Sequence, residues 1–185
     1  MASKKTNIVL IGMAGAGKST VGLSLARCLG RPFVDTDDLI SSSRGSTLQE
    51  TIDREGVETF RRYEEQVLLE VSLRDHVIAT GGSVIYSERG MAHLRSCGTV
   101  VYLDLPLEVL QARVDNVDGR GLVRSPEQSF AELFEERQPL YGQWADLTID
   151  CSGKSVDEIS HEITTALGEK IPMAACTPEP SPTRR

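Results

Sequence analysis

The chain has 185 residues, of which 39% are hydrophobic, and this length and composition suit one packed domain. Its formal net charge of −7 argues against nucleic acid or an anionic membrane as its main partner. The same charge does not exclude a small anionic substrate, because a few arginines can form a local positive pocket. We expect a single domain over residues 1–171 and a proline-rich, disordered tail over 172–185.

The strongest pattern lies near the N-terminus. Residues 12–19 read Gly-Met-Ala-Gly-Ala-Gly-Lys-Ser, which is the form G-x-x-x-x-G-K-[ST], and they follow the apolar run 8–11. A strand, a glycine-rich loop and a helix N-terminus together form a phosphate cradle. Lys18 is then placed to reach the β- and γ-phosphates of a nucleotide, and the Ser19 hydroxyl can ligate Mg²⁺. A glycine-rich turn without a ligand is the alternative, but the Lys-Ser ending and both flanks favour phosphate binding.

The rest of the chain alternates between short buried strands and amphipathic helices. Beyond a first helix that ends at Gly30, strands are expected at residues 32–37, 77–80, 99–103 and 147–150. Helices are expected over about 48–73 with a break at Gly56, around 91–94, from Pro106, from a capping box at 125–128 to about Pro139, and from a second capping box at 155–158. This alternation predicts a mainly parallel sheet covered on both faces.

The cysteines and the terminal sequence point to a reducing compartment. Four widely spaced cysteines without a C-x-x-C pair are more typical of buried or incidental thiols than of a disulfide framework or zinc site. The first residues lack the apolar region of a signal peptide, and no run of about 18 apolar residues predicts a membrane span. We expect a cytoplasmic monomer.

Four features in order along the chain resemble the shikimate kinase family over roughly residues 7–167. They are the phosphate loop at 12–19, Asp-Thr-Asp at 35–37, Phe-Arg-Arg-Tyr-Glu-Glu at 60–65, and Gly81-Gly82. The resemblance implies an α/β fold of the P-loop NTPase type, a three-layer αβα sandwich around a five-stranded parallel sheet in the order 2-3-1-4-5, with a mobile lid at about 115–125. It also implies ATP-dependent phosphorylation of the 3-hydroxyl of shikimate, a step of aromatic amino-acid biosynthesis, with Mg²⁺ as cofactor.

The resemblance also implies roles for individual residues. The expected catalytic residues are Lys18, Asp37 and Arg120. ATP is expected to contact Gly15, Ala16, Gly17, Lys18, Ser19, Thr20, Arg113 and Arg120, and Mg²⁺ is expected to contact Ser19 and Asp35. Shikimate is expected to contact Asp37, Arg61, Gly81, Gly82 and Arg137.

The chemistry of these side chains agrees with the implied roles. Asp35 and Asp37 follow a strand and so lie at the edge of the sheet where ligands bind, and Asp37 could deprotonate an attacking hydroxyl. The guanidinium groups of Arg61 and Arg137 suit a carboxylate because their donors match two oxygens at once. Glu64 lies one helical turn after Arg61 and is expected to hold it.

Structural explanations exist for some of these residues. Asp35 and Asp37 could act only as helix N-caps, and the charged cluster at 60–65 could be a solvated helix face. Arg113 could be an exposed helix charge rather than a neighbour of adenine. Ser83 stands where the family has a third glycine; a serine there is strained if the position needs positive φ, and otherwise adds a donor near the substrate.

Three other functions are consistent with part of the pattern. A related P-loop kinase could act on another small hydroxylated acid, and a nucleotide-binding regulatory homologue could have lost catalysis. The presence of every expected catalytic residue argues against the second. An enzyme like adenylate kinase fits less well, because two arginines and Asp37 suit a hydroxylated carboxylate better than a second nucleotide.

Overall fold

The computed structural model describes residues 5–115, 123 and 127–169. Several of the expected features lie outside the described residues. They are Arg120, most of the lid segment at 115–125, the start of the capping box at 125–128, and the tail at 172–185.

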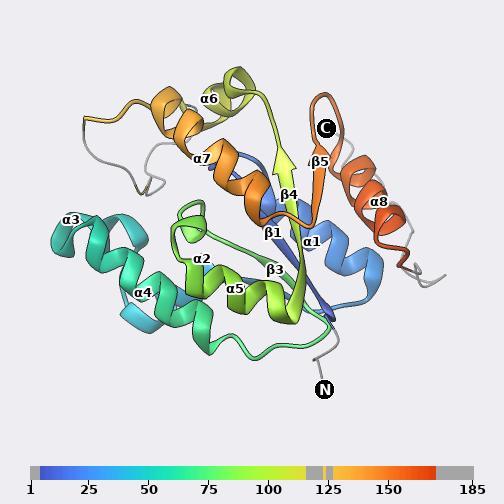
Figure 1. The fold of residues 1–185 in the computed structure, drawn as a ribbon, viewed down its shortest axis with the longest axis horizontal. Coiled ribbons are helices and arrows are strands. Elements are labelled where there is room, and N and C mark those ends of the chain that lie inside the picture. The colour runs from blue at the N-terminus through green and yellow to red at the C-terminus, as the bar shows by residue number, and fades with distance from the viewer. Residues whose placement is uncertain (1–4, 116–122, 124–126, 170–185) are drawn as a thin grey trace, which may run out of the picture.

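Five parallel strands form one sheet in the order β2-β3-β1-β4-β5, which confirms the prediction (Figure 1). They are β1 (Asn7–Ile11), β2 (Phe33–Asp35), β3 (Val77–Ala79), β4 (Gly98–Asp104) and β5 (Leu147–Asp150). The central strand β1 pairs Val9 with Ile78 of β3 on one side and with Val100 of β4 on the other. The strands are parallel because every connection between them contains a helix, which returns the chain to the starting edge.

Helices cover both faces of the sheet and complete the three-layer sandwich. They are α1 (Lys18–Leu29), α2 (Thr36–Arg44), α3 (Leu48–Glu55), α4 (Val57–Glu70), α5 (Glu88–Cys97), α6 (Leu107–Asp115), α7 (Phe130–Trp144) and α8 (Val156–Ala166), with a short 3₁₀ helix η1 (Val84–Tyr86). Helices α1 and α8 pack together against one face, and α5 and α7 contact the other (Figure 1). Helix α4 packs on α5, and α2 and α3 pack on α4, while α2 also contacts β2.

Two apolar clusters hold these layers. The main core surrounds β1, whose residues are all buried, because a strand covered on both faces reads as a continuous apolar run. A second, smaller cluster joins Ile40 of α2, Phe60 of α4 and Val123, with Ile52 packed against it. Packing therefore accounts for the apolar stripe of α3 and α4 and fixes this helical region beside the sheet.

Helix α7 continues through Pro139 to Trp144, so the prediction that it stops near Pro139 is wrong. A proline inside a helix removes one backbone hydrogen bond and disfavours the preceding turn. Packing outweighs that cost here. Arg137 and Tyr141 on either side of the proline are buried, and the Tyr141 ring stacks on Tyr102 of β4 with centroids 5.1 Å apart.

The start of the same helix also differs from the prediction. The capping box is formed by Ser129, whose hydroxyl accepts from the Glu132 amide, while the Glu132 side chain accepts from the Ser129 amide. The motif expected at 125–128 is therefore placed four residues too early. The second expected box is confirmed, because Ser155 and Glu158 make the reciprocal bonds at the start of α8.

Two expectations about the whole chain can be checked on its described part. Within residues 5–115, 123 and 127–169, no helix is both long and apolar enough to cross a membrane. Cys28 and Cys97 are partly buried, Cys151 is buried, and the fourth cysteine lies outside the described residues.

Gly12, where β1 turns into the phosphate loop, provides a test of the fold. Its φ is 146°, and a Cβ atom there would lie 2.8 Å from the carbonyl oxygen of Leu103. We expect Gly12→Ala to lower the free energy of unfolding by about 1–3 kcal/mol, and the melting temperature by roughly 2–10 °C.

The matched control is Gly142→Ala in α7, where nothing lies within 4 Å of the added Cβ. A helical alanine in place of glycine is worth about 0.5–1 kcal/mol in stability. Equal melting temperatures for the two variants, measured by circular dichroism, would contradict the close contact at Gly12.

Candidate active site

The phosphate loop runs from the end of β1 to the start of α1. Its backbone turns through positive φ at Gly12, Gly15 and Gly17, a region that L side chains rarely adopt. Gly17 is the N-cap of α1, so the free N–H groups of the first helical turn open toward the loop. Lys18 begins that turn, and its Nζ donates to the carbonyl oxygens of Gly12 (2.7 Å) and Met13 (2.9 Å). The ammonium group is therefore held at the loop, where a phosphate would lie.

The carboxyl end of β2 brings a carboxylate to the same place. The Ser19 hydroxyl donates to Oδ2 of Asp35 at 2.6 Å. Oδ1 of Asp35 accepts from the Asp37 amide at 3.0 Å, so Asp35 is also the N-cap of α2. The capping role and the expected metal role thus use different oxygens of one side chain. In the described part of the chain, no group of three or more His, Cys, Asp or Glu residues gathers as a cation site.

The Ser19 and Asp35 oxygens fit Mg²⁺ as a donor set. This ion prefers hard oxygen ligands and usually keeps several waters, with one or two protein ligands and substrate phosphates completing its shell. One hydroxyl and one carboxylate beside a phosphate cradle match that requirement.

Two carboxyl groups converge on Gly81, after β3. A Cβ atom on Gly81 would lie 2.7 Å from both Asp37 Oδ1 and Glu64 Oε1, so any larger residue would displace them. The Gly81 N–H donates to the Thr36 hydroxyl at 3.3 Å. Gly81 therefore leaves room for the two carboxyl groups because it has no side chain. The sequence analysis expected its backbone N–H to donate to the substrate.

Glu64 is buried beside Gly81 and bonds to the unusual serine. The Ser83 hydroxyl donates to Glu64 Oε2 at 2.7 Å. Burial raises the pKa of Glu64 to about 7 and the Asp37 charge adds to that rise, while the Ser83 hydrogen bond opposes it. Ser83 has φ −88°, so the position does not need positive φ and the serine is unstrained.

Among the described residues, no hydrogen bond joins Glu64 to Arg61. Arg61 Nη1 instead donates to Glu58 at 3.3 Å, and its guanidinium carbon lies 4.1 Å from the centroid of the Tyr86 ring. The helical spacing does place both side chains on α4, but Glu64 turns to Ser83 and Arg61 turns to Tyr86. The charge of Arg61 nevertheless lowers the pKa of Glu64, so the role of Glu64 in holding Arg61 stays a prediction.

Arg137 reaches the same region from α7 and is only 1% exposed. Its Nε donates to the Tyr86 hydroxyl at 3.2 Å, and its Nη2 donates to the Val123 carbonyl. A Cβ on Gly82 would lie 3.1 Å from Nη1 of Arg137, so this arginine faces the glycine turn. The structure thus brings together the two arginines expected to bind a carboxylate, although they come from different helices.

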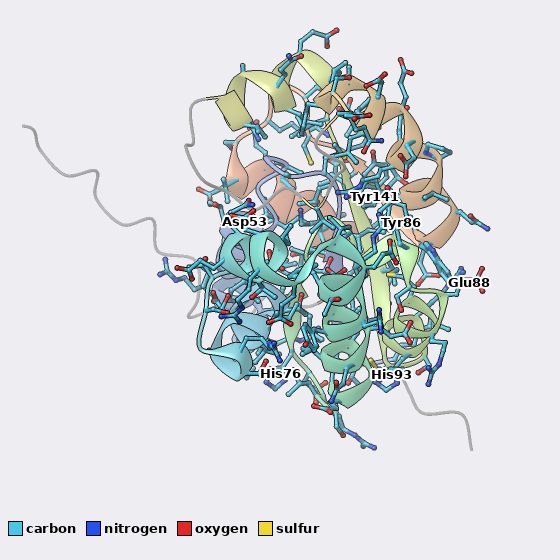
Figure 2. All side chains as sticks on the ribbon, turned by 90° about the vertical axis from the view of Figure 1, so that its left-hand side faces the viewer. Asp53, His76, Tyr86, Glu88, His93 and Tyr141 are labelled. Carbon is cyan, nitrogen blue, oxygen red and sulfur yellow. The ribbon has the colours of Figure 1, made fainter. Side chains whose placement is uncertain are left out.

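Tyr86 and Tyr141 also lie beside these arginines and the glycine turn. The sequence analysis did not predict either of them as a site residue. Tyr86 contacts both arginines, and Tyr141 donates to the Gly82 carbonyl at 2.6 Å. Figure 2 labels both tyrosines. Tyr141 follows Arg137 by one helical turn, and this spacing in the sequence indicates that the two side chains lie on the same face of the helix. Tyr86 lies in the short η1 turn, and its sequence neighbourhood carries no periodic pattern.

The nucleotide side is only partly described. Arg113 donates from Nη1 to the Gly15 carbonyl at 3.0 Å, so it contacts the phosphate loop and is more than an isolated helix charge. Ala16 lies buried in the loop, and Thr20 is exposed on the first turn of α1. The expected lid arginine, Arg120, lies outside the described residues.

A phosphate loop follows the central strand of a 2-3-1-4-5 sheet, and arginines and carboxylates gather around Gly81, Gly82 and Tyr86. This combination is that of a P-loop kinase of small molecules. A family model described as shikimate kinase matches residues 14–168. A shikimate kinase of Caldanaerobacter subterraneus subsp. tengcongensis is 39% identical and covers 86% of this chain and 95% of its own. The chain belongs to the shikimate kinase family.

Solved structures agree. A shikimate kinase from Acinetobacter baumannii in complex with shikimate has a TM-score of 0.82 at 36% identity and covers 91% of this chain and 96% of its own. A shikimate kinase from Aquifex aeolicus has a TM-score of 0.76 at 34% identity, over 88% and 96%. The sheet order and the flanking helices of the present structure therefore belong to this kinase fold.

The raised pKa of Glu64 predicts an unusual dependence of stability on pH. A carboxyl group with a raised pKa in the folded state stabilises the fold below its unfolded pKa of about 4.5, and this contribution is lost as the pH rises through about 7. The free energy of unfolding of the wild type should therefore fall, relative to Glu64→Gln, by on the order of 3 kcal/mol between pH 4.5 and 8.

Urea unfolding at several pH values measures this difference. Glu70→Gln, an exposed replacement at the end of the same helix, controls for the change of carboxylate to amide. Parallel profiles for the wild type and Glu64→Gln would show that burial does not shift the Glu64 carboxyl.

Proposed function

We propose that this protein transfers the γ-phosphoryl group of ATP to the 3-hydroxyl of shikimate, giving shikimate 3-phosphate and ADP for aromatic amino-acid biosynthesis. One observation carries the proposal. Asp35 contacts Ser19 of the phosphate loop through one oxygen and the Asp37 amide through the other, so the donor and acceptor sides meet at one carboxylate. Membership of the shikimate kinase family supports the choice of acceptor.

Phosphoryl transfer needs positioning and charge neutralisation more than covalent help from the protein. Lys18 lies at the phosphate loop and neutralises the β- and γ-phosphates. Ser19 and Asp35 would hold Mg²⁺, which supplies further neutralisation of the phosphates when bound. Gly15, Ala16, Gly17 and Thr20 would contact the phosphates around the helix N-terminus, and Arg113 would approach the nucleotide from α6.

Asp37 is the proposed base for the acceptor. Its carboxylate lies at Gly81, beside the turn that follows β3, and would take the proton of the attacking 3-hydroxyl. The new bond joins that oxygen to the γ-phosphorus while the bond to the ADP oxygen breaks. Arg120 is proposed to close over the γ-phosphate with the lid at 115–125 and to exclude water.

The acceptor carboxylate is proposed to bind Arg61 and Arg137, with the Gly82 amide as a further donor. Both guanidinium groups lie beside Tyr86, and Arg137 also faces Gly82. A carboxylate suits this place because a buried arginine needs a charged or polar partner for each remaining donor. We further propose that the protein works as a cytoplasmic monomer on small molecules, without nucleic-acid or membrane partners, in keeping with its net charge of −7.

A coupled assay of ADP release tests the reaction. We expect ADP release with shikimate and Mg²⁺, and no comparable turnover with a panel of other hydroxylated acids. Lys18→Met should lower kcat by at least about 10²–10³, because a preorganised donor to the reacting phosphate is lost. Turnover only with another acid would overturn the substrate while keeping the kinase, and no turnover with any acid would favour a regulatory role.

Arg61→Ala tests the carboxylate site. Because hydrogen bonds between charged groups contribute about 1.5–3 kcal/mol, the KM for shikimate should rise about tenfold to a hundredfold. The KM for ATP should stay within about twofold, because the described contacts of Arg61 with Glu58 and Tyr86 do not involve the phosphate loop. Arg62→Ala is the matched control, since Arg62 is the exposed neighbour on the same helix. Equal effects of the two substitutions on the KM for shikimate would refute the assignment.

A further inference from the structure

The ring of Tyr86 lies against both arginines of the proposed carboxylate site. Its ring centroid lies 4.1 Å from the guanidinium carbon of Arg61 and 5.2 Å from that of Arg137. The face of an aromatic ring attracts a cation at these distances. Two positive groups that would otherwise repel each other are therefore both stabilised by one neutral side chain.

The Tyr86 hydroxyl adds two hydrogen bonds to these ring contacts. It accepts from Arg137 Nε at 3.2 Å and donates to Glu136 Oε1 at 2.5 Å. Burial raises the pKa of Tyr86, so the hydroxyl keeps its proton at neutral pH. The same hydrogen bond is the main reason that the pKa of Glu136 is lowered. The pair therefore places a negative charge close to Arg137.

The backbone of Tyr86 is held firmly. Its amide donates to the Ser83 carbonyl at 3.0 Å within the η1 turn, and the preceding residues Val84 and Ile85 are buried in the core. This turn directly follows Gly81 and Gly82. The ring is thus fixed to the same turn that receives the acceptor.

Arg61 has weaker partners besides Tyr86. Its charge lowers the pKa of Glu64 and of Glu136, so both carboxyl groups attract it. Its hydrogen bond among the described residues goes to Glu58, whose side chain is 78% exposed, and such surface ion pairs contribute little. Its Nε is buried without a hydrogen-bond partner among the described residues. The Tyr86 ring, 4.1 Å from the guanidinium carbon, is therefore a contact that restricts the conformation of this long side chain.

We propose that Tyr86 is a positioning residue that holds the guanidinium groups of Arg61 and Arg137 together in the geometry that binds the acceptor carboxylate. The inference rests on the proposed function, because it assigns the carboxylate to these two arginines. Preorganisation of this kind strengthens binding by removing the ordering cost of flexible side chains. Tyr86 is expected to affect binding of the acceptor and not of ATP. Neither its ring nor its hydroxyl contacts a described residue of the phosphate loop.

Steady-state kinetics on the full chain tests this role with two variants. Tyr86→Leu removes the ring and the hydroxyl, and we expect the KM for shikimate to rise about tenfold. Tyr86→Phe keeps the ring over Arg61 but loses both hydrogen bonds, and we expect a rise of about threefold. In both variants the KM for ATP should stay within about twofold of the wild type. The kcat at saturating shikimate should stay within about threefold.

Tyr63→Leu is the matched control. Tyr63 also lies under an arginine, Arg44, at 3.8 Å, and its hydroxyl also donates to a glutamate, Glu55. Because neither partner belongs to the proposed carboxylate site, this variant should keep the KM for shikimate within about twofold. A rise equal to that of Tyr86→Leu would show a general loss of packing and would overturn the proposal.

A double-mutant cycle identifies the route of the effect. If Tyr86 acts through Arg61, the rise in KM for Tyr86→Leu combined with Arg61→Ala is smaller than the product of the two single effects. Multiplicative effects would overturn the coupling to Arg61. If Tyr86→Leu unfolds at the assay temperature, Tyr86→Phe decides alone: a rise of threefold or more supports the role, and an unchanged KM overturns it.

The failure of this inference can be told from a failure of the proposed function. Absence of wild-type turnover with shikimate, or an unchanged KM in Arg61→Ala, contradicts the proposed function. A raised KM in Arg61→Ala together with a wild-type KM in both Tyr86 variants contradicts only the role of Tyr86.

Discussion

The Asp35 carboxylate accepts hydrogen bonds from two different parts of the chain, the Ser19 hydroxyl in the first turn of α1 and the Asp37 amide in the first turn of α2. Both helices start at the same edge of the sheet because β1 and β2 are parallel members of it. The N-terminus of α2, and with it Asp37, is therefore positioned relative to the phosphate loop by one side chain.

The acceptor side depends on a different constraint, the burial of charge. Arg137 is almost completely buried, and Glu64 is buried beside Gly81. Buried charged groups are tolerated only when partners satisfy them. The Tyr86 hydroxyl and the Val123 carbonyl accept hydrogen bonds from two nitrogens of Arg137. The Ser83 hydroxyl donates to one oxygen of Glu64, whose pKa nevertheless rises to about 7. These partners come from segments far apart in the sequence, so the pocket forms only when the whole domain has folded.

The donor half of the site was predictable from the sequence, and much of the acceptor half was not. The phosphate loop is a local structure in which glycines and the Lys-Ser step dictate backbone and charge together. The partner of Arg61 could not be predicted in the same way. Helical spacing favoured Glu64, but spacing states only which side chains can meet, and Ser83 and Tyr86 compete for them across the fold.

Helix α7 shows the same limit at the level of secondary structure. Pro139 is unfavourable for a helix locally, yet α7 continues because Arg137 and Tyr141 gain more from packing against the sheet and the glycine turn than the proline costs. The sequence by itself determined the alternation of strands and helices, the order of the sheet through the family resemblance, and the phosphate loop, because these depend on periodicity and on local backbone requirements. Only the tertiary structure decided that Arg61 and Arg137 meet at Tyr86, because these contacts depend on how three separate segments pack.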